Sequence, residues 1–260
     1  MKRYELKGTG CFYERETLPN GLDLILIPNE KSSVKKNYYL TFGTYYGALY
    51  NEFCPVSSTT KKKFPYGISH FLEHKCFETN QTKSPFDFYA ESGSYVNAYT
   101  NYMMTCYIVT GSKKFNENLH ELLSFVMTPY FTDENVLKEK GIIKEEINMR
   151  EDDPDYVVMR KLNENLFASY PYRYPVAGRI KDIEKITKED LYQCYSSFYQ
   201  PSNMFFIAAG AFPKEELIKE IKKFTKEHNF IDSAPIPKKI VPSEPLEVVK
   251  EEEILYKEIK

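Results

Sequence analysis

The chain has 260 residues, of which 42% are hydrophobic and 28% charged, an ordinary composition for a globular protein. A formal net charge of -2 excludes a strongly basic nucleic-acid-binding protein, and no apolar run reaches the roughly 20 residues that span a bilayer. The five cysteines form no C-x-x-C pair, and the start has no apolar signal-peptide core. We therefore expect a cytoplasmic protein from a reducing compartment, with neither nucleic acid nor membrane as partner.

Two strands and a helix are predicted in the first third. Residues 20–30 read as a turn followed by an apolar strand, and the aromatic, β-branched residues 37–50 predict a second strand. Pro65 is typical of a first helical turn and predicts a helix over residues 65–78. The apolar face of that helix is expected to carry Ile68, Phe71, Leu72 and Phe77.

The middle of the chain predicts a second helix and a hairpin. Ser84 is a suitable N-cap for the helix and Gly93 a suitable terminator. Residues 95–100 and 104–110 read as two strands joined by a tight turn at Asn101-Tyr102.

Helical patterns dominate the rest of the chain. They cover residues 113–127, 132–152, 153–170, 186–199 and 213–230, with an apolar strand at 203–210; the expected caps are Thr132 or Asp133 and Thr187, and Pro213 is expected in a first turn. The order predicts an α+β fold, a mostly antiparallel sheet with helices packed on one face. We expect residues 1–230 to form one domain, and the proline-rich residues 231–260 a linker and the first strand of a second half.

Two of only four histidines lie in the stretch GISHFLEHKCFE. On a helix, His70 and His74 lie about one turn apart on the same face, so both imidazoles can reach one ion. Zinc is favoured because it binds nitrogen and carboxylate ligands in tetrahedral geometry. Glu73 lies at the edge of that face, where it can contact a metal-bound water. The pattern is H-x-x-E-H, the inverse of H-E-x-x-H.

A hydrogen-bonded surface cluster is the alternative for a bare histidine pair. The presence of Glu73, the apolar neighbours and the scarcity of histidine elsewhere favour the metal. A structural zinc site is disfavoured because such sites use cysteine, and Cys76 is expected to point away from this face. His120 and His228 lie in lysine-rich amphipathic patterns and are expected at the surface.

A catalytic zinc needs a third protein ligand and an open position for water. The best candidates lie in EKGIIKEEINM, where Glu139 and Glu146 are seven residues apart and share a helix face. Either carboxylate can ligate the ion while the other supports a ligand from behind, and Glu145 is expected to point elsewhere. Spacing leaves the choice between Glu139 and Glu146 open. In isolation this stretch is equally typical of a solvated acidic face.

Three stretches together resemble a known family. GISHFLEHKCFE, GSYVNAYTNYMMTCYIV and LKEKGIIKEEINMREDDPD are similar, in this order, to the signature blocks of the pitrilysin/insulinase family of zinc metallopeptidases. The mitochondrial-processing-peptidase-like members are the most similar in style. With weaker similarity further on, the resemblance covers residues 21–224. Three ordered blocks are far more specific than one five-residue motif.

The resemblance implies a role for each matching residue of the site. It implies one zinc ion (Zn2+) per chain, with His70, His74 and Glu146 as ligands. It implies Glu73 as the general base on the zinc-bound water and Glu139 as a catalytic-site carboxylate that supports the ligands. The implied activity is that of a zinc-dependent metalloendopeptidase.

The resemblance also implies a substrate surface. Asn97, Ala98 and Tyr99 would lie on the sheet edge along which an extended peptide or unfolded-protein substrate binds, because a strand edge offers unpaired N–H and C=O groups. An ordinary core hairpin is the alternative for this stretch.

A second half is a further expectation. The family builds its chamber from two homologous halves, so the resemblance implies a second half or a partner subunit. We expect this chain to be a fragment of a longer protein with a complete zinc site, rather than a half that pairs with another chain. The alternative function is a non-catalytic peptide-recognition or scaffold subunit of a two-component processing complex, against which the intact H-x-x-E-H motif argues. A zinc enzyme acting on small molecules is a weaker alternative.

Overall fold

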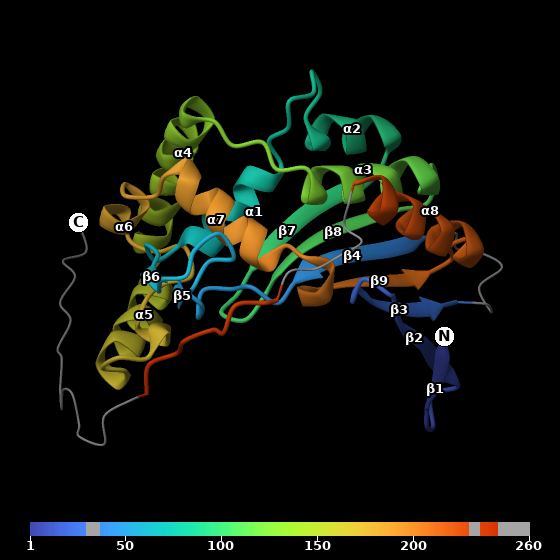
Figure 1. The fold of residues 1–260 in the computed structure, drawn as a ribbon, viewed down its shortest axis with the longest axis horizontal. Coiled ribbons are helices and arrows are strands. Elements are labelled where there is room, and N and C mark those ends of the chain that lie inside the picture. The colour runs from blue at the N-terminus through green and yellow to red at the C-terminus, as the bar shows by residue number, and fades with distance from the viewer. Residues whose placement is uncertain (30–36, 229–234, 244–260) are drawn as a thin grey trace.

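A seven-stranded sheet with the order β1-β2-β3-β9-β4-β8-β7 forms the centre of the protein (Figure 1). The computed structural model describes residues 1–29, 37–228 and 235–243. The strands of this sheet are β1 (Lys2–Leu6), β2 (Cys11–Thr17), β3 (Asp23–Pro28), β4 (Tyr38–Thr44), β7 (Tyr95–Thr100), β8 (Thr105–Gly111) and β9 (Met204–Gly210). A separate two-stranded sheet pairs β5 (Glu52–Phe53) with β6 (Lys62–Lys63).

The sheet is mixed. β3 and β9 run parallel, and every other neighbouring pair in the seven-stranded sheet is antiparallel, as the sequence predicted for most of it. β9 reads MFFIAAG, a continuous apolar run typical of a strand with both edges paired, and it lies between β3 and β4. Phe42 of β4 pairs with Phe206 of β9, and both side chains are fully buried.

The helices cover one face of the sheet and continue past the β7 end of it (Figure 1). α1 packs on β7 and β8, α3 on β4 and β8, and α2 on β7. The helices are α1 (Ile68–Cys76), α2 (Pro85–Ser92), α3 (Phe115–Met127), α4 (Asp133–Glu151), α5 (Pro154–Leu166), α6 (Ile180–Ile183), α7 (Lys188–Phe198) and α8 (Lys214–Glu227), with short 3-10 turns η1 (Pro171–Arg173) and η2 (Pro201–Asn203). This arrangement confirms the predicted α+β fold.

Side-chain caps appear where the sequence predicts them. The hydroxyls of Ser84, Thr132 and Thr187 each accept a hydrogen bond from a backbone N–H in the first turn of α2, α4 and α7. Gly93 ends α2 with φ 68°, a left-handed conformation that glycine adopts without strain.

The first helix begins later than predicted. α1 starts at Ile68 instead of Pro65, because Gly67 is its N-cap with φ 89°. A Cβ at Gly67 would clash with the Ala177 carbonyl, so the turn needs glycine to bring the start of α1 against that segment. The placement of Pro65 in a helical turn was therefore wrong. Pro213 is likewise the N-cap of α8 and not part of its first turn.

Several strand expectations also needed correction. The strand predicted over 37–50 ends at Thr44, and the hairpin of β1 and β2 was not predicted. Residues 235–243 contain no helix or strand, and Ile240 N donates to Glu52 O at 3.1 Å. The strand expected at the end of residues 231–260 lies outside the described residues.

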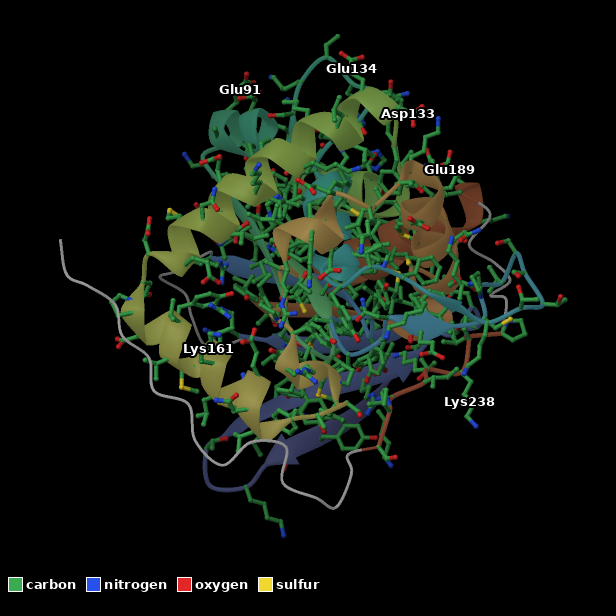
Figure 2. All side chains as sticks on the ribbon, turned by 90° about the vertical axis from the view of Figure 1, so that its left-hand side faces the viewer. Glu91, Asp133, Glu134, Lys161, Glu189 and Lys238 are labelled. Carbon is green, nitrogen blue, oxygen red and sulfur yellow. The ribbon has the colours of Figure 1, made fainter. Side chains whose placement is uncertain are left out.

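Several charged side chains lie at the outside of the described structure. Figure 2 shows Asp133 and Glu189 directed outward from the ribbon. Among the described residues, no helix is both long and apolar enough to cross a membrane.

Candidate metal centre

The helix that carries both histidines is anchored by its apolar face. Ile68, Phe71 and Leu72 are fully buried, as predicted, and Phe77 is partly buried just after the helix. Burial of each such side chain stabilises the fold by about 1.5–3 kcal/mol, which is more than a solvent-exposed ion pair contributes. The same packing turns His70 and His74 toward α4.

A buried lysine fixes α1 against α4. The Lys75 side chain is fully buried, and its Nζ donates to Asn135 O at 3.2 Å and pairs with Glu78 Oε2 at 2.6 Å. A buried ammonium must keep such partners, because it is costly to remove them. Lys75 thereby links the histidine helix to the first turn of α4, the helix that presents the carboxylates.

Three donor atoms converge at this contact. Glu146 Oε2 lies 3.6 Å from His70 Nε2 and 3.6 Å from His74 Nε2. One ligand atom of each residue lies within 4.8 Å of those of the other two, and this is the one such group found in the described chain. Of the two carboxylates that spacing left open, Glu146 is thus the one that faces both histidines.

Glu139 holds the second histidine from behind. His74 Nδ1 lies 2.8 Å from Glu139 Oε1, and an ionised carboxylate can only accept, so Nδ1 donates. Nε2 then carries the free lone pair on the side of Glu146. Burial lowers the pKa of His74, but the hydrogen bond and charge of Glu139, with Glu73 and Glu146, outweigh it and raise the pKa overall. A more basic imidazole is a better metal ligand.

His70 is kept neutral by its surroundings. Burial and the neighbouring His74 lower the pKa of His70 to about 4. At neutral pH the ring therefore offers a lone pair and no charge. Its buried Nδ1 has no hydrogen-bond partner within the described residues, whereas Nε2 faces Glu146.

Arg150 holds the third carboxylate. Its Nη2 and Nε donate to Glu146 Oε1 at 2.7 and 3.1 Å, one helical turn along α4. Oε2 is left to face His70 and His74. Burial raises the pKa of Glu146, but the neighbouring His70, the hydrogen bond and charge of Arg150, and His74 outweigh it and lower the pKa overall. The carboxylate is therefore ionised and oriented.

These residues fit a zinc ion. A tetrahedral ion bound at about 2.1 Å places its ligand atoms roughly 3.4 Å apart, close to the two 3.6 Å separations. Two imidazoles and one carboxylate are also a donor set typical of catalytic zinc. Glu145 is exposed on α4 and does not join the group, as expected.

Glu73 is a buried carboxylate beside this group. Only 7% of it is exposed, and Thr100 Oγ1 donates to its Oε2 at 2.6 Å. Burial raises the pKa of Glu73, and the Thr100 hydrogen bond partly opposes that rise. A carboxyl with a raised pKa is suited to accept a proton and return it at neutral pH.

A cavity of about 440 Å³ opens at Glu73 and His74. Its apolar wall consists of Phe77, Phe86 and Ile142, and β7 borders it at Asn97 and Ala98.

β7 presents a free edge to this cavity. It is the last strand of the sheet and pairs with β8 on one side; among the described residues no strand pairs with its other side. Asn97 is exposed, and Ala98 packs partly against the core on the helix-covered side. The Tyr99 side chain, 44% exposed, points to the opposite face of the sheet from Ala98 and does not line the cavity.

Two residues of the site were not found from the sequence. Arg150 has a detectable signal, its i, i+4 spacing from Glu146 on a helix. Thr100 has only a weak one, since it shares a strand face with Ala98. His120 and His228 lie on α3 and at the end of α8, away from the metal group.

The fold and this site together define a class: α+β domains of metallopeptidases with an inverted H-x-x-E-H helix. Residues 57–179 match the profile of the insulinase family, peptidase family M16, and residues 185–258 match that of the peptidase M16 inactive domain. The chain belongs to peptidase family M16.

Proteins similar to this chain are named as zinc proteases or as peptidases. The zinc protease YmfH of Bacillus subtilis is 36% identical over 245 residues, which cover 94% of this chain and 54% of YmfH. A mitochondrial-processing peptidase subunit beta of Arabidopsis thaliana is 30% identical over 165 residues, covering 62% of this chain and 31% of that subunit. The crystal structure of an M16-like peptidase from Alicyclobacillus acidocaldarius superimposes with a TM-score of 0.81 at 33% identity, covering 93% of this chain and 55% of that one. The chain thus spans about half the length of YmfH and of this peptidase.

Proposed function

We propose that this chain is the metal-bearing part of a zinc-dependent endopeptidase that hydrolyses extended peptides. The observation that carries the proposal is the convergence of His70, His74 and Glu146 beside the buried carboxylate of Glu73. His70, His74 and Glu146 would hold the ion, and Glu139 would orient His74. The names of the relatives support zinc and peptidase activity for the family.

The chemistry divides between the ion and Glu73. Zinc, when bound, acts as a Lewis acid that acidifies a water molecule and polarises the scissile carbonyl. Glu73 accepts the proton of the attacking water and delivers it to the leaving nitrogen. Thr100 keeps one oxygen of Glu73 hydrogen-bonded, so the other oxygen is the one available for this proton transfer.

The substrate would bind as an additional strand. The free edge of β7 supplies N–H and C=O groups to an extended peptide, as in other complexes in which a peptide adds a strand to a sheet. A side chain of that peptide near the scissile bond would enter the cavity. The wall of Phe77, Phe86 and Ile142 favours an apolar side chain there.

A second half or partner subunit would close the site. The matched relatives are about twice as long as this chain, which supports that proposal. The half length of the chain also gives support to the alternative function. That alternative is a peptide-recognition subunit, which binds a peptide without cutting it. The complete set of His70, Glu73, His74 and Glu146 favours the peptidase.

The test is hydrolysis of a quenched fluorescent peptide library by the zinc-loaded chain and its Glu73→Gln variant. We expect the variant to keep one zinc per chain and to lose about 10²–10⁴-fold in kcat/KM, because only the proton acceptor is removed. Zinc is measured by elemental analysis and turnover by fluorescence.

Glu145→Gln is the matched control. It makes the same chemical change at an exposed position of α4 and should alter neither zinc content nor rate. Wild-type turnover by Glu73→Gln would refute the role of Glu73. Peptide binding without cleavage, by the zinc-loaded chain joined to a second half, would favour the recognition subunit.

A further inference from the structure

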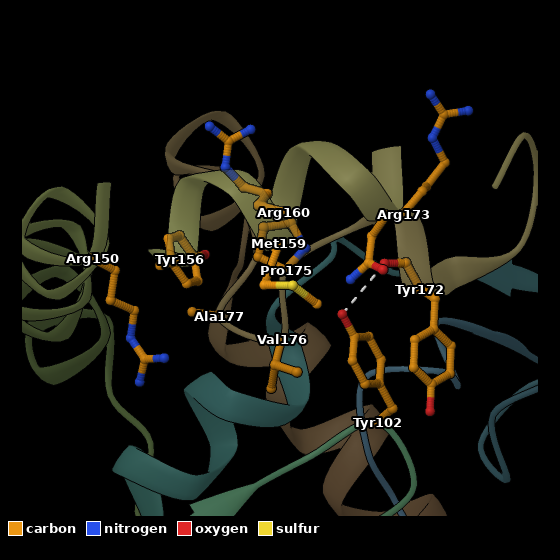
Figure 3. Close-up of a pocket in the computed structure, with 11 residues that line it drawn as sticks. Tyr102, Arg150, Tyr156, Met159, Arg160, Tyr172, Arg173, Pro175, Val176 and Ala177 are labelled. Atoms are coloured by element: carbon orange, nitrogen blue, oxygen red, sulfur yellow. Dashed lines mark hydrogen bonds between the residues drawn. The ribbon is translucent and has the colours of Figure 1, made fainter. Parts of the chain in front are cut away.

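A second pocket adjoins the metal centre. It holds about 150 Å³ and is lined by residues that include Tyr102 and Arg150 (Figure 3). The cavity at the metal centre borders β7 at Asn97 and Ala98, whereas this pocket borders Tyr102, two residues past the end of the strand. A peptide along β7 would therefore meet the cavity and the pocket with side chains a few positions apart.

The pocket has aromatic walls that are fixed in place. The Tyr102 and Tyr172 rings stack with centroids 3.9 Å apart, and the Tyr102 hydroxyl donates to Tyr174 O at 3.1 Å. Tyr156 of α5 and Val176 complete the walls (Figure 3). These surfaces suit the aliphatic stem of a side chain, and the Tyr102 hydroxyl is already engaged.

Arg150 is the cation that the pocket can use. In Figure 3 the guanidinium groups of Arg160 and Arg173 point away from the pocket, and Arg160 is paired with Glu151 and Glu164. No acidic side chain is found among the described residues that line the pocket. An anion that enters would therefore meet positive charge and no carboxylate on the wall.

The Arg150 guanidinium has one edge used and one edge left. Glu146 Oε1 takes the edge formed by Nε and Nη2. Within the described part of the chain Nη1 makes no hydrogen bond, and 49% of the side chain is exposed. The Nη1–Nη2 edge can bind a second carboxylate through two parallel hydrogen bonds, the arrangement arginine favours.

We propose that this pocket is a specificity subsite that binds a glutamate or aspartate side chain of the peptide substrate, through Arg150. The inference rests on the proposed peptidase function and adds a substrate class to it. Arg150 then contacts the metal-ligand carboxylate and the substrate carboxylate at the same time. Arg150 would thus have two roles, to orient Glu146 and to bind the substrate carboxylate. An experiment can separate them, because only the second role depends on the sequence of the peptide.

The test is a positional scan with zinc-loaded full chain. One extended apolar peptide carries a single glutamate at each position in turn, and each peptide has a glutamine twin. We expect one position at which the glutamate peptide has about tenfold higher kcat/KM than its twin, because glutamine is isosteric but uncharged. In Arg150→Met the ratio at that position should fall to about one. Because the ratio compares two peptides cleaved by the same variant, a loss of zinc lowers both rates equally and leaves the ratio unchanged.

Arg15→Met is the matched control. Arg15 is also half exposed and paired with a carboxylate, Asp23, but lies on β2 at the far end of the sheet, so its ratio should stay tenfold. A parallel arm measures binding of both peptides to Glu73→Gln by fluorescence anisotropy. Preferential binding of the glutamate peptide without cleavage by the wild type would support the subsite and refute the peptidase. Cleavage with equal ratios at every position, a preference for an aromatic residue at the selected one, or an unchanged ratio in Arg150→Met would overturn the subsite.

Discussion

Two helix pairs in this molecule are joined by nearly identical contacts. Between α1 and α4, His74 Nδ1 lies 2.8 Å from Glu139 Oε1; between α3 and α8, His120 Nδ1 lies 2.9 Å from Glu220 Oε1. The first pair is 25% and 6% exposed, the second 54% and 23%. The chemistry is the same, yet only the first belongs to a group that can hold a metal.

The difference lies in what surrounds each histidine. The His74 nitrogen opposite Glu139 faces Glu146 and a second imidazole, and the lower exposure of this pair reduces competition from water. His120 instead packs edge-on against the Phe224 ring, and exposed ion pairs contribute little to stability. A histidine–carboxylate contact therefore defines a site only where further donors converge on it.

The largest expected effect separates the two histidines. His74→Ala should reduce bound zinc from one per chain to nearly none, because two protein ligands do not retain the ion against a chelator. His120→Ala should keep one zinc per chain. Elemental analysis after dialysis measures both. Equal zinc contents in the two variants would show that the α1–α4 pair is no more a metal site than the α3–α8 pair.

The carboxylates of the two pairs give a smaller contrast. Glu139→Gln should weaken zinc affinity about 10–100-fold, because His74 loses the charged acceptor that orients it. Glu220→Gln should leave the affinity unchanged. Competition with a fluorescent chelator measures the dissociation constant. An unchanged affinity in Glu139→Gln would mean that packing alone holds the His74 ring.

The smallest effect is a shift of the pH profile. The Thr100 hydrogen bond opposes the rise that burial causes in the pKa of Glu73. Thr100→Val removes that bond, so the pKa of Glu73 rises further and the ionised base appears only at higher pH. The acidic limb of kcat/KM should move up by roughly half to one pH unit.

Thr41→Val provides the control for this shift. Thr41 is a largely buried threonine of β4 in the same sheet, without a contact to the site. Its variant should show the wild-type profile. An acidic limb that moves to lower pH in Thr100→Val would contradict the assigned sign.

The sequence predicted those parts of the site that lie close together along the chain. His70, Glu73 and His74 share one helical turn, so helix periodicity alone places them on or near one face. Glu139 and Glu146 could be placed on one face of α4 but not ranked, because ranking depends on how α4 crosses α1. The Lys75 contact with the first turn of α4 helps to fix that crossing, and it is a tertiary contact that no local pattern shows.

The remaining features depend on contacts between distant segments. The walls of the second pocket combine Tyr102, Tyr156 and Tyr172 from three separate elements, which no local pattern connects. The hairpin of β1 and β2 was missed because its residues are mostly exposed and lack the apolar alternation typical of a half-buried strand. Pro65 misled because a proline before a Gly-capped turn resembles a proline in a first helical turn.

The parallel pairing of β3 with β9 has a consequence for how the molecule is made. Asp23 lies opposite Phe205, so the central strand arrives only after all the metal-site residues have left the ribosome. Until then β3 and β4 each expose a hydrogen-bonding edge, and a nascent chain in that state is open to wrong pairing with other chains. Such distant contacts also make folding intrinsically slow, which lengthens the time for which these edges stay exposed.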